Sequence, residues 1–233
     1  MADKSNSMLT KTPKQREAIA LLSGPASQDL LFGGSRSGKT LILLYAMLCR
    51  ALKTKSRHII LRRHFNHVKT SVWLDTLPKV LGMVAPNLPA TWNNVDFVLE
   101  FPHNDSEIWI GGLDDKERTE KVLGHEFSTI FLNECSQISF DAYETARTRL
   151  AENSGLALKL YADCNPPRAK HWAHKLWIEH VSPVDGGLLP NADDYASLLM
   201  NPEDNRANLP SGYIENVLGR LSKRQRDRFL LGL

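Results

Sequence analysis

The sequence predicts an α/β fold in which helices cover both faces of a mainly parallel sheet. Three observations lead to this prediction. Short apolar runs typical of buried strands alternate along the chain with longer runs typical of helices. A glycine-rich turn separates the first of these strands from an apolar helix. The length of 233 residues, with 42% hydrophobic and 24% charged residues, suits one large globular domain.

The expected elements follow in chain order. A first helix begins at Thr12-Pro13, with the proline in its first turn, and ends at Leu22 before the break at Gly24-Pro25. Strands are predicted over residues 29–32, 58–61, 97–101, 107–110, 128–132 and 156–162. Further helices are predicted over residues 41–52, 68–81, 143–150, 171–177, 211–218 and 222–230. Residues 184–210 are rich in Gly, Pro, Asn and Asp, and we expect a long surface excursion there.

The composition narrows the class of protein. A formal net charge of +3 permits contact with nucleic acid but does not require it. The polar N-terminus lacks the apolar core of a signal peptide, and the apolar run over residues 41–48 is too short to span a membrane. Three cysteines without a C-x-x-C pair suit reduced thiols in a cytosol-like compartment.

The glycine-rich turn fits the phosphate-binding pattern G-x-x-x-x-G-K-[ST]. Its residues are Gly33, Gly34, Ser35, Arg36, Ser37, Gly38, Lys39 and Thr40. The glycines allow backbone N–H groups to wrap round phosphates, and the helix that follows offers its positive end to the same anion. Lys39 is placed to reach the β- and γ-phosphates of ATP, and the Thr40 hydroxyl to ligate Mg²⁺. The motif predicts a P-loop NTPase of the RecA-like (ASCE) type. Arg36 is either a contact to phosphate or DNA, or a solvated side chain.

A second polar site follows the strand predicted over residues 128–132. Glu134 comes directly after this apolar strand, at the end where ligands lie in open α/β sheets, and can orient the attacking water. The preceding position, usually an aspartate on the metal side, is Asn133. An amide brings no charge, but it can hydrogen-bond a water bound to Mg²⁺. The alternative is that Glu134 is a helix-capping or surface carboxylate.

The next strand leads into Asp163-Cys164-Asn165-Pro166. An amide at Asn165 could sense the γ-phosphate and relay its loss to the rest of the domain. Taken alone, Asn-Pro is an ordinary turn signal.

The order of these motifs resembles the ATPase domain of the large terminase subunit of tailed bacteriophages. The matching segments are TPKQREAI, GGSRSGKT, LRRHFNHVKTSVW, GGLDDKERTEKVLGHEFSTIFLNE, DCNPP and LPSGYIENVLGRLSKRQRDRFLLGL, and they extend from about residue 12 to the last residue. The resemblance implies an ATP-hydrolysing motor that drives double-stranded viral DNA into a procapsid, as a ring of five subunits docked on the portal protein and aided by a small terminase subunit. It also implies action in the host cytoplasm, with no membrane association.

The resemblance implies roles for individual residues as well. Gln15 matches a glutamine that recognises adenine, Glu134 the catalytic Walker B glutamate, and Asn165 the coupling motif. Lys39 and Thr40 match the Walker A lysine and Mg²⁺ ligand. Arg118 and Lys121 lie where a basic finger could reach the site of the neighbouring subunit.

The sequence pattern and the resemblance together predict three parts of the chain. Residues 1–12 are expected to be a flexible arm, residues 13–210 the ATPase domain, and residues 211–233 a helical segment that leads toward a nuclease domain. No strand-borne acidic cluster follows Asn165, so nuclease activity is not expected from this chain.

Several polar and aromatic features leave alternatives open. The segment Arg62-Arg63, together with Lys69, either contacts phosphate, DNA or ATP, or belongs to a solvated loop. A basic run near the C-terminus is a DNA contact, a link to a further domain or a solvated helix face. The run consists of Lys223, Arg224, Arg226 and Arg228. The pairs His64/His67 and His171/His174 lack further ligands at a spacing that suits zinc. The five tryptophans have no regular period and are expected to pack in the core.

Two other functions remain compatible with these patterns. A helicase-like, nucleic-acid-dependent ATPase would normally require a second RecA-like domain, for which the chain is too short. A nucleotide-gated assembly module with little turnover is favoured only by Asn133.

Overall fold

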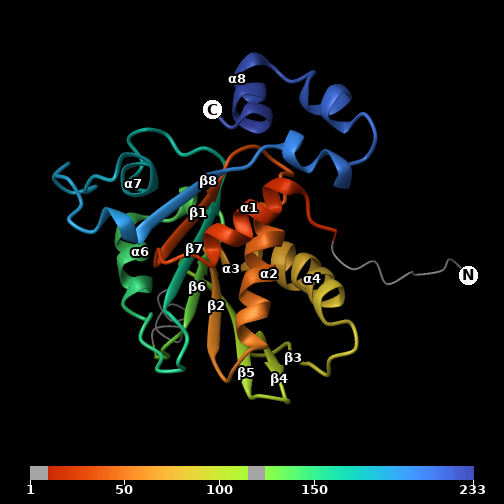
Figure 1. Ribbon diagram of the computed structural model, residues 1–233, viewed down its shortest axis with the longest axis vertical. Coiled ribbons are helices and arrows are strands. Elements are labelled where there is room, and N and C mark those ends of the chain that lie inside the picture. Colours follow the sequence, from red (N-terminus) through yellow and green to blue (C-terminus); the bar gives the residue numbers. More distant parts are fainter. Residues whose placement is uncertain (1–9, 115–123) are drawn as a thin grey trace, which may run out of the picture.

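A mixed sheet of eight strands organises the part of the chain that the structure, a computed structural model, describes, which is residues 10–114 and 124–233. The strands are β1 (Gln28–Phe32), β2 (Arg57–Arg62), β3 (Thr91–Asn93), β4 (Val98–Phe101), β5 (Ser106–Gly112), β6 (Thr129–Leu132), β7 (Lys159–Cys164) and β8 (Tyr195–Leu199). Their order across the sheet is β3-β4-β5-β2-β6-β7-β1-β8. All neighbours from β5 to β8 pair in parallel, whereas β3 and β4 are antiparallel. The predicted mainly parallel α/β fold is confirmed (Figure 1).

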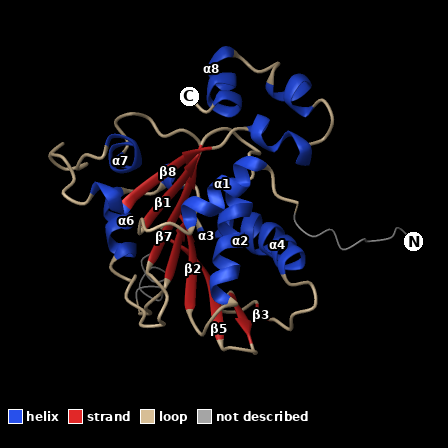
Figure 2. Ribbon diagram, viewed as in Figure 1, coloured by secondary structure: helices blue, strands red, loops and turns tan. Residues whose placement is uncertain are grey.

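Helices connect the strands and cover both faces of the sheet. The α-helices are α1 (Pro13–Leu22), α2 (Lys39–Ala51), α3 (Phe65–Val68), α4 (Leu77–Val84), α6 (Phe140–Arg147), α7 (Trp172–His174) and α8 (Lys223–Arg226). The π-helical segments are η1 (Lys69–Thr76), η3 (Lys175–Glu179), η6 (Ile214–Leu218) and η7 (Asp227–Leu231), and the 3-10 helices are η2 (Cys135–Gln137), η4 (Ala192–Asp194) and η5 (Pro202–Asn208). Figure 2 shows α1, α2 and α4 on one side of the sheet and α6 and α7 on the other.

The central strands are apolar on both faces because each face has its own core. On β1, Leu31 belongs to the core under α2, whereas its neighbour Leu30 belongs to the core under α6 and α7. Ile60 and Ile59 alternate in the same way on β2. Continuous apolar runs, rather than alternating ones, are typical of strands that are buried on both faces. The tryptophans also pack as expected, since Trp73 and Trp177 are at most 2% exposed.

The strand order brings three chain segments to one edge of the sheet. β7 lies between β1 and β6, and Leu31 and Asp163 are register partners on β1 and β7. Leu132 of β6 pairs with Ala162 of β7, so the next residues on the two strands, Asn133 and Asp163, are neighbours as well. The carboxyl ends of β1, β6 and β7 therefore meet at a single place, which is where open α/β sheets bind ligands.

The prediction of a long surface excursion over residues 184–210 is wrong for the second half of this segment. Tyr195–Leu199 forms β8, which pairs in parallel with β1, and η5 begins soon after it at Pro202. The short strand β3 was also not predicted. Both segments are short and flanked by polar residues, and they become strands because they pair with β1 and β4. The composition of a short segment does not predict such pairing.

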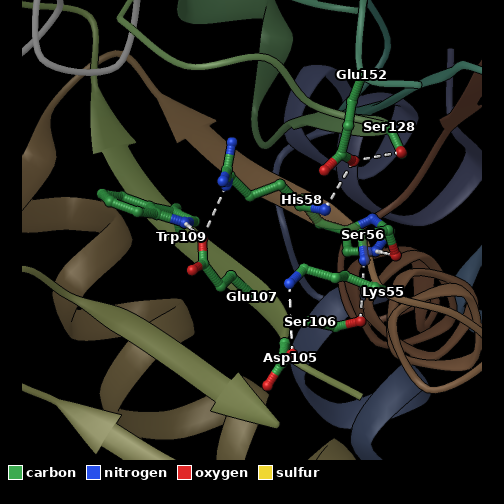
Figure 3. Close-up of polar contacts among 10 residues, drawn as sticks. Lys55, Ser56, His58, Asp105, Ser106, Glu107, Trp109, Ser128 and Glu152 are labelled. Carbon is green, nitrogen blue, oxygen red and sulfur yellow. Dashed lines mark hydrogen bonds and ion pairs between the residues drawn. The ribbon is translucent and has the colours of Figure 1, made fainter. Parts of the chain in front are cut away.

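The amino end of the sheet is occupied by structural hydrogen bonds (Figure 3). His58 is fully buried, and its Nε2 lies 2.9 Å from the Ser56 hydroxyl. Glu152 accepts hydrogen bonds from the Ser128 hydroxyl at 2.5 Å and from the Arg57 backbone N–H at 2.8 Å. These contacts satisfy buried polar groups at the edge opposite to the converging carboxyl ends.

The C-terminal segment lies beyond the carboxyl ends of the strands, where Figure 1 shows α8 above the sheet. Across the residues that the structure describes, no helix has both the length and the apolar character needed to cross a bilayer.

Candidate nucleotide-binding site

The phosphate loop connects β1 to α2 in the predicted succession of strand, loop and helix. Gly33 has φ +129° and Gly38, the N-cap of α2, has φ +87°, conformations that glycine adopts readily. Arg36 has φ +59°, which is uncommon for a residue with a side chain. Because α2 begins at Lys39, the positive end of the helix faces the loop.

The Lys39 ammonium is held inside the loop. Its Nζ donates to the carbonyl oxygens of Gly33 at 3.2 Å and Gly34 at 2.6 Å, and to the Ser37 hydroxyl at 3.0 Å. Burial lowers the pKa of Lys39, and the nearby carboxylates of Asp163 and Glu134 oppose this shift. The lysine is thus a buried cation within reach of the space above the loop.

Residues distant in sequence support the loop from the other side. Asn201, which follows β8 after Met200, accepts the Gly34 N–H at 2.9 Å and donates to the Leu231 carbonyl at 2.9 Å. The Ser35 N–H donates to the Phe229 carbonyl of η7 at 2.9 Å. Sequence analysis did not find these partners, because a lone Asn and a backbone carbonyl carry no motif.

Polar groups from α2, β6 and β7 meet beside the loop. Asp163, which is 2% exposed, accepts the Thr40 hydroxyl at 2.5 Å. Its other oxygen accepts the Asn133 side-chain amide at 2.9 Å and the Glu134 backbone N–H at 2.7 Å. Asp163 was not among the predicted site residues, although its place near the end of a buried strand, close to Asn165, was a usable signal.

Glu134 occupies a strained position at the mouth of this cluster. Its φ is +55°, in the left-handed region, where non-glycine residues are often functional. Burial raises the pKa of the Glu134 carboxyl and the neighbouring Asp163 raises it further, while Arg62 and Lys39 oppose the shift. A carboxyl with a raised pKa among cations is typical of a group that handles a proton or a water.

Arg62 at the end of β2 turns toward the same site. Its Nη1 donates to the Ser71 hydroxyl of η1 at 3.1 Å, and its Nε is buried without a hydrogen-bond partner among the described residues. Arg63 is exposed, and the Lys69 ammonium lies 5.0 Å from the centre of the Phe97 ring. Of the three basic residues that the sequence left open, the structure places Arg62 at the site.

These groups line one cavity of about 550 Å³. Its walls are the loop from Ser35 to Thr40, the carboxyl ends of β2, β6 and β7, and one side of η1. The charged and hydrogen-bonding side chains that line it include those of Arg36, Lys39, Thr40, Arg62, Asn133, Glu134, Asp163 and Asn165.

Gln15 lies behind the loop rather than among the residues that line this cavity. It is the N3 residue of the capping box of α1, in which its Oε1 accepts the Thr12 N–H at 3.0 Å. Its Nε2 donates to Asn205 at 3.2 Å, and Asn205 donates to the Arg36 carbonyl of the loop at 2.8 Å. The amide is thus tied to the phosphate loop, and its role toward adenine stays a prediction.

Two predicted residues, Arg118 and Lys121, lie outside the described residues. The histidine pairs have other partners, since His64 Nδ1 lies 2.7 Å from Asp114 and His171 caps α7 by accepting the Ala173 N–H. Within residues 10–114 and 124–233 there is no cluster of three His, Cys, Asp or Glu side chains that could hold a metal.

The residues beside Thr40 suit a magnesium ion that is shared with a nucleotide. Hard cations such as Mg²⁺ take oxygen ligands, commonly one or two carboxylates together with phosphates and waters. The Thr40 hydroxyl and the Asp163 carboxylate are oxygen donors, and Asn133 Oδ1 is buried without a hydrogen-bond partner among the described residues. The donor set fits the ion, provided that the phosphates supply the remaining charge.

Three features define a P-loop nucleotide-binding domain of the RecA-like type. They are the phosphate loop between β1 and α2, the insertion of β7 between β1 and β6, and the carboxylate of Glu134 after β6. The family model described as phage terminase large subunit matches residues 26–229, and the chain belongs to this family.

Individual relatives agree with this assignment. The PBSX phage terminase large subunit of Bacillus subtilis (strain 168) is 23% identical over 147 residues, which are 63% of this chain and 33% of the relative. The large terminase of a thermophilic bacteriophage superposes with a TM-score of 0.80 at 16% identity, covering 97% of this chain and 54% of the relative. The same large terminase has also been solved in complex with ADP, with a TM-score of 0.76, 17% identity and coverage of 95% and 53%.

The ATPase domain of the Thermus phage P74-26 large terminase gives a TM-score of 0.65 at 13% identity, covering 96% of this chain and 93% of the other. The chain therefore spans about a third of the curated relative and about half of the large terminase solved with ADP, but nearly all of an isolated ATPase domain.

Proposed function

We propose that this chain is the ATP-hydrolysing motor domain of a phage DNA-packaging enzyme, which drives double-stranded DNA into a procapsid. The observation that carries the proposal is the cavity in which the phosphate loop, Arg62 and Glu134 meet. The family supports it, as does the thermophilic bacteriophage relative that was solved with ADP.

The cavity suits phosphoryl transfer by positioning and electrostatics. The loop amides and Lys39 would hold the phosphates, and Arg62 would stabilise charge on the transferred group from the opposite wall. Glu134 would orient the attacking water and receive its proton. Mg²⁺, when bound, would neutralise charge that develops on the phosphate oxygens. Asn165, at the end of β7, would relay loss of the γ-phosphate.

The remaining parts of the mechanism extend the proposal beyond this chain. Gln15 would contribute to adenine recognition through its link to the loop. Arg118 or Lys121 would reach the cavity of a neighbouring subunit as a trans-acting finger within a ring of five. The ring would dock on the portal protein in the host cytoplasm, and a small terminase subunit would present the viral DNA.

A basic groove of about 690 Å³ is the best candidate for the DNA contact among the described residues. It begins at Pro166, directly after Asn165, and it is lined by the exposed side chains of Arg168, Lys223, Arg224 and Arg228, with Asp227 as its only acidic residue. Contacts of this kind are made to phosphates, so binding would be insensitive to sequence and strongly sensitive to salt.

The proposal is tested by measuring affinity for a fluorescent ATP analogue, ATP turnover and DNA translocation with the portal-bearing procapsid. We expect Lys39→Ala to abolish analogue binding, whereas Lys69→Ala, outside the cavity, should bind normally. Normal analogue binding by Lys39→Ala would contradict the proposed site. Unwinding of a forked duplex by the chain alone would favour a helicase, and tight binding without hydrolysis in an assembled ring would favour an assembly module.

A further inference from the structure

The magnesium side of the cavity lacks the carboxylate that P-loop NTPases usually place at the end of the Walker B strand. In P-loop NTPases, Mg²⁺ is held by the loop hydroxyl and by an aspartate at that position. Here β6 is followed by Asn133, whose side chain is neutral. The negative charge must come from elsewhere if the site is to hold a divalent cation.

Asp163 is a buried carboxylate in direct contact with the Thr40 hydroxyl of the phosphate loop. It lies on β7, which the strand order inserts between β1 and β6, and the register places it beside Asn133. Its Oδ2 accepts the Thr40 hydroxyl at 2.5 Å. Because this bond uses the only hydrogen of the hydroxyl, the lone pairs of Thr40 Oγ1 are left for a cation.

The side-chain amide of Asn133 donates hydrogen bonds to this carboxylate and does not take its place. Its Nδ2 lies 2.9 Å and 3.2 Å from the two Asp163 oxygens, so the amide donates to Asp163. The same orientation leaves Asn133 Oδ1 pointing away from Asp163, buried and without a partner among the described residues. An aspartate at position 133 would instead face Asp163 with a second negative charge, which is unfavourable in a buried site. The pair therefore contains a single ionisable carboxyl.

We propose that Asp163 supplies the negative charge of the Mg²⁺ site and orients the Thr40 hydroxyl, so that the metal-side carboxylate has moved from β6 to β7. Asn133 Oδ1 accepts a hydrogen bond from a water of the ion. This inference rests on the proposed nucleotide binding, and it concerns Asp163 as a positioning residue.

Exchange of the two side chains tests the proposal. A fluorescent ATP analogue is titrated into the wild-type chain, Asp163→Asn, and the exchange variant Asn133→Asp/Asp163→Asn, once with EDTA and once with Mg²⁺. Asp105→Asn is the matched control, because Asp105 precedes β5 at the opposite edge of the sheet, is 72% exposed and pairs with Lys55. Circular dichroism and thermal unfolding report whether each variant is folded.

We expect Mg²⁺ to tighten analogue binding by the wild-type chain and by Asp105→Asn. In Asp163→Asn, affinity in EDTA should persist while the Mg²⁺ enhancement falls by about tenfold or more, the loss typical of removing a group that supports a metal site. The exchange variant should regain most of the enhancement, which a merely structural role of Asp163 would not produce.

Other results would overturn the proposal. They are full enhancement in Asp163→Asn, no recovery in the exchange variant, or no enhancement in the wild-type chain. If Asp163→Asn does not fold, the proposal is judged from the Mg²⁺ enhancement of analogue binding in the exchange variant alone. Absence of analogue binding by the wild-type chain in both buffers would instead contradict the proposed nucleotide site itself.

Discussion

The buried imidazole of His58 should make the stability of this domain fall in mild acid. Burial, together with the nearby Arg50 guanidinium, lowers the pKa of His58 from 6.5 to about 3. Below pH 6.5 the unfolded chain binds a proton that the folded chain does not, so the free energy of unfolding decreases as the pH falls from 6.5 toward 3. The two pKa values predict a loss of about 3 kcal/mol in the free energy of unfolding between pH 7.5 and pH 4.5.

Chemical denaturation at a series of pH values measures this loss. Asp29 has a pKa raised to about 6 by burial, so its contribution has the opposite sign: stability is lost as pH rises from 3.8 toward 6. For this reason, the relevant quantity is the difference in pH profile between the wild-type chain and His58→Gln. The variant should lose most of the dependence attributed to His58, whereas the same substitution at the exposed His103 should change nothing. Equal pH profiles for the wild-type chain and His58→Gln would exclude the His58 imidazole as the source of the acid sensitivity.

Three further substitutions probe the loop, the cavity and the support beneath it. Gly33→Ala should lower the free energy of unfolding by about 1–3 kcal/mol, because Gly33 has φ +129° and an added Cβ would clash with the Met200 carbonyl. An unchanged melting temperature would contradict this prediction. Arg62→Gln should reduce kcat by about a hundredfold with little change in KM, while Arg63→Gln retains normal turnover; equal rates would remove Arg62 from the mechanism. Lys159→Met should destabilise the domain by about 3–5 kcal/mol at neutral pH, because the fully buried Asp29 carboxylate, 3.1 Å from the Lys159 ammonium, loses its partner. In chemical denaturation, the double variant Lys159→Met/Asp29→Asn should regain part of this stability. No recovery would argue against the pairing.

The sequence was most informative where local pattern and chemistry coincide. The succession of β1, phosphate loop and α2 could be predicted because glycine conformation, helix start and motif all act within a few residues. Glu134 could be placed at the cavity because it follows a buried apolar strand. Its predicted catalytic role is still to be tested by experiment.

Other parts depend on contacts that no short segment reports. Asp163 becomes a partner of Thr40 only because β7 inserts between β1 and β6, and strand order is a long-range property. β8 is a five-residue strand between polar turns, so its composition resembles that of a loop. Asn201 and the Phe229 carbonyl reach the phosphate loop across most of the chain length.

The central claim is that ATP is hydrolysed in the cavity beside Glu134, and ATP turnover per subunit tests it most directly. The wild-type chain and Glu134→Gln are compared over a wide range of protein concentration, with analogue binding measured in parallel. We expect Glu134→Gln to bind nucleotide without turnover, and wild-type turnover per subunit to rise with concentration as neighbouring subunits complete the site. Undiminished turnover by Glu134→Gln would exclude Glu134 as the catalytic carboxylate, and a wild-type rate independent of concentration would contradict the trans-acting finger.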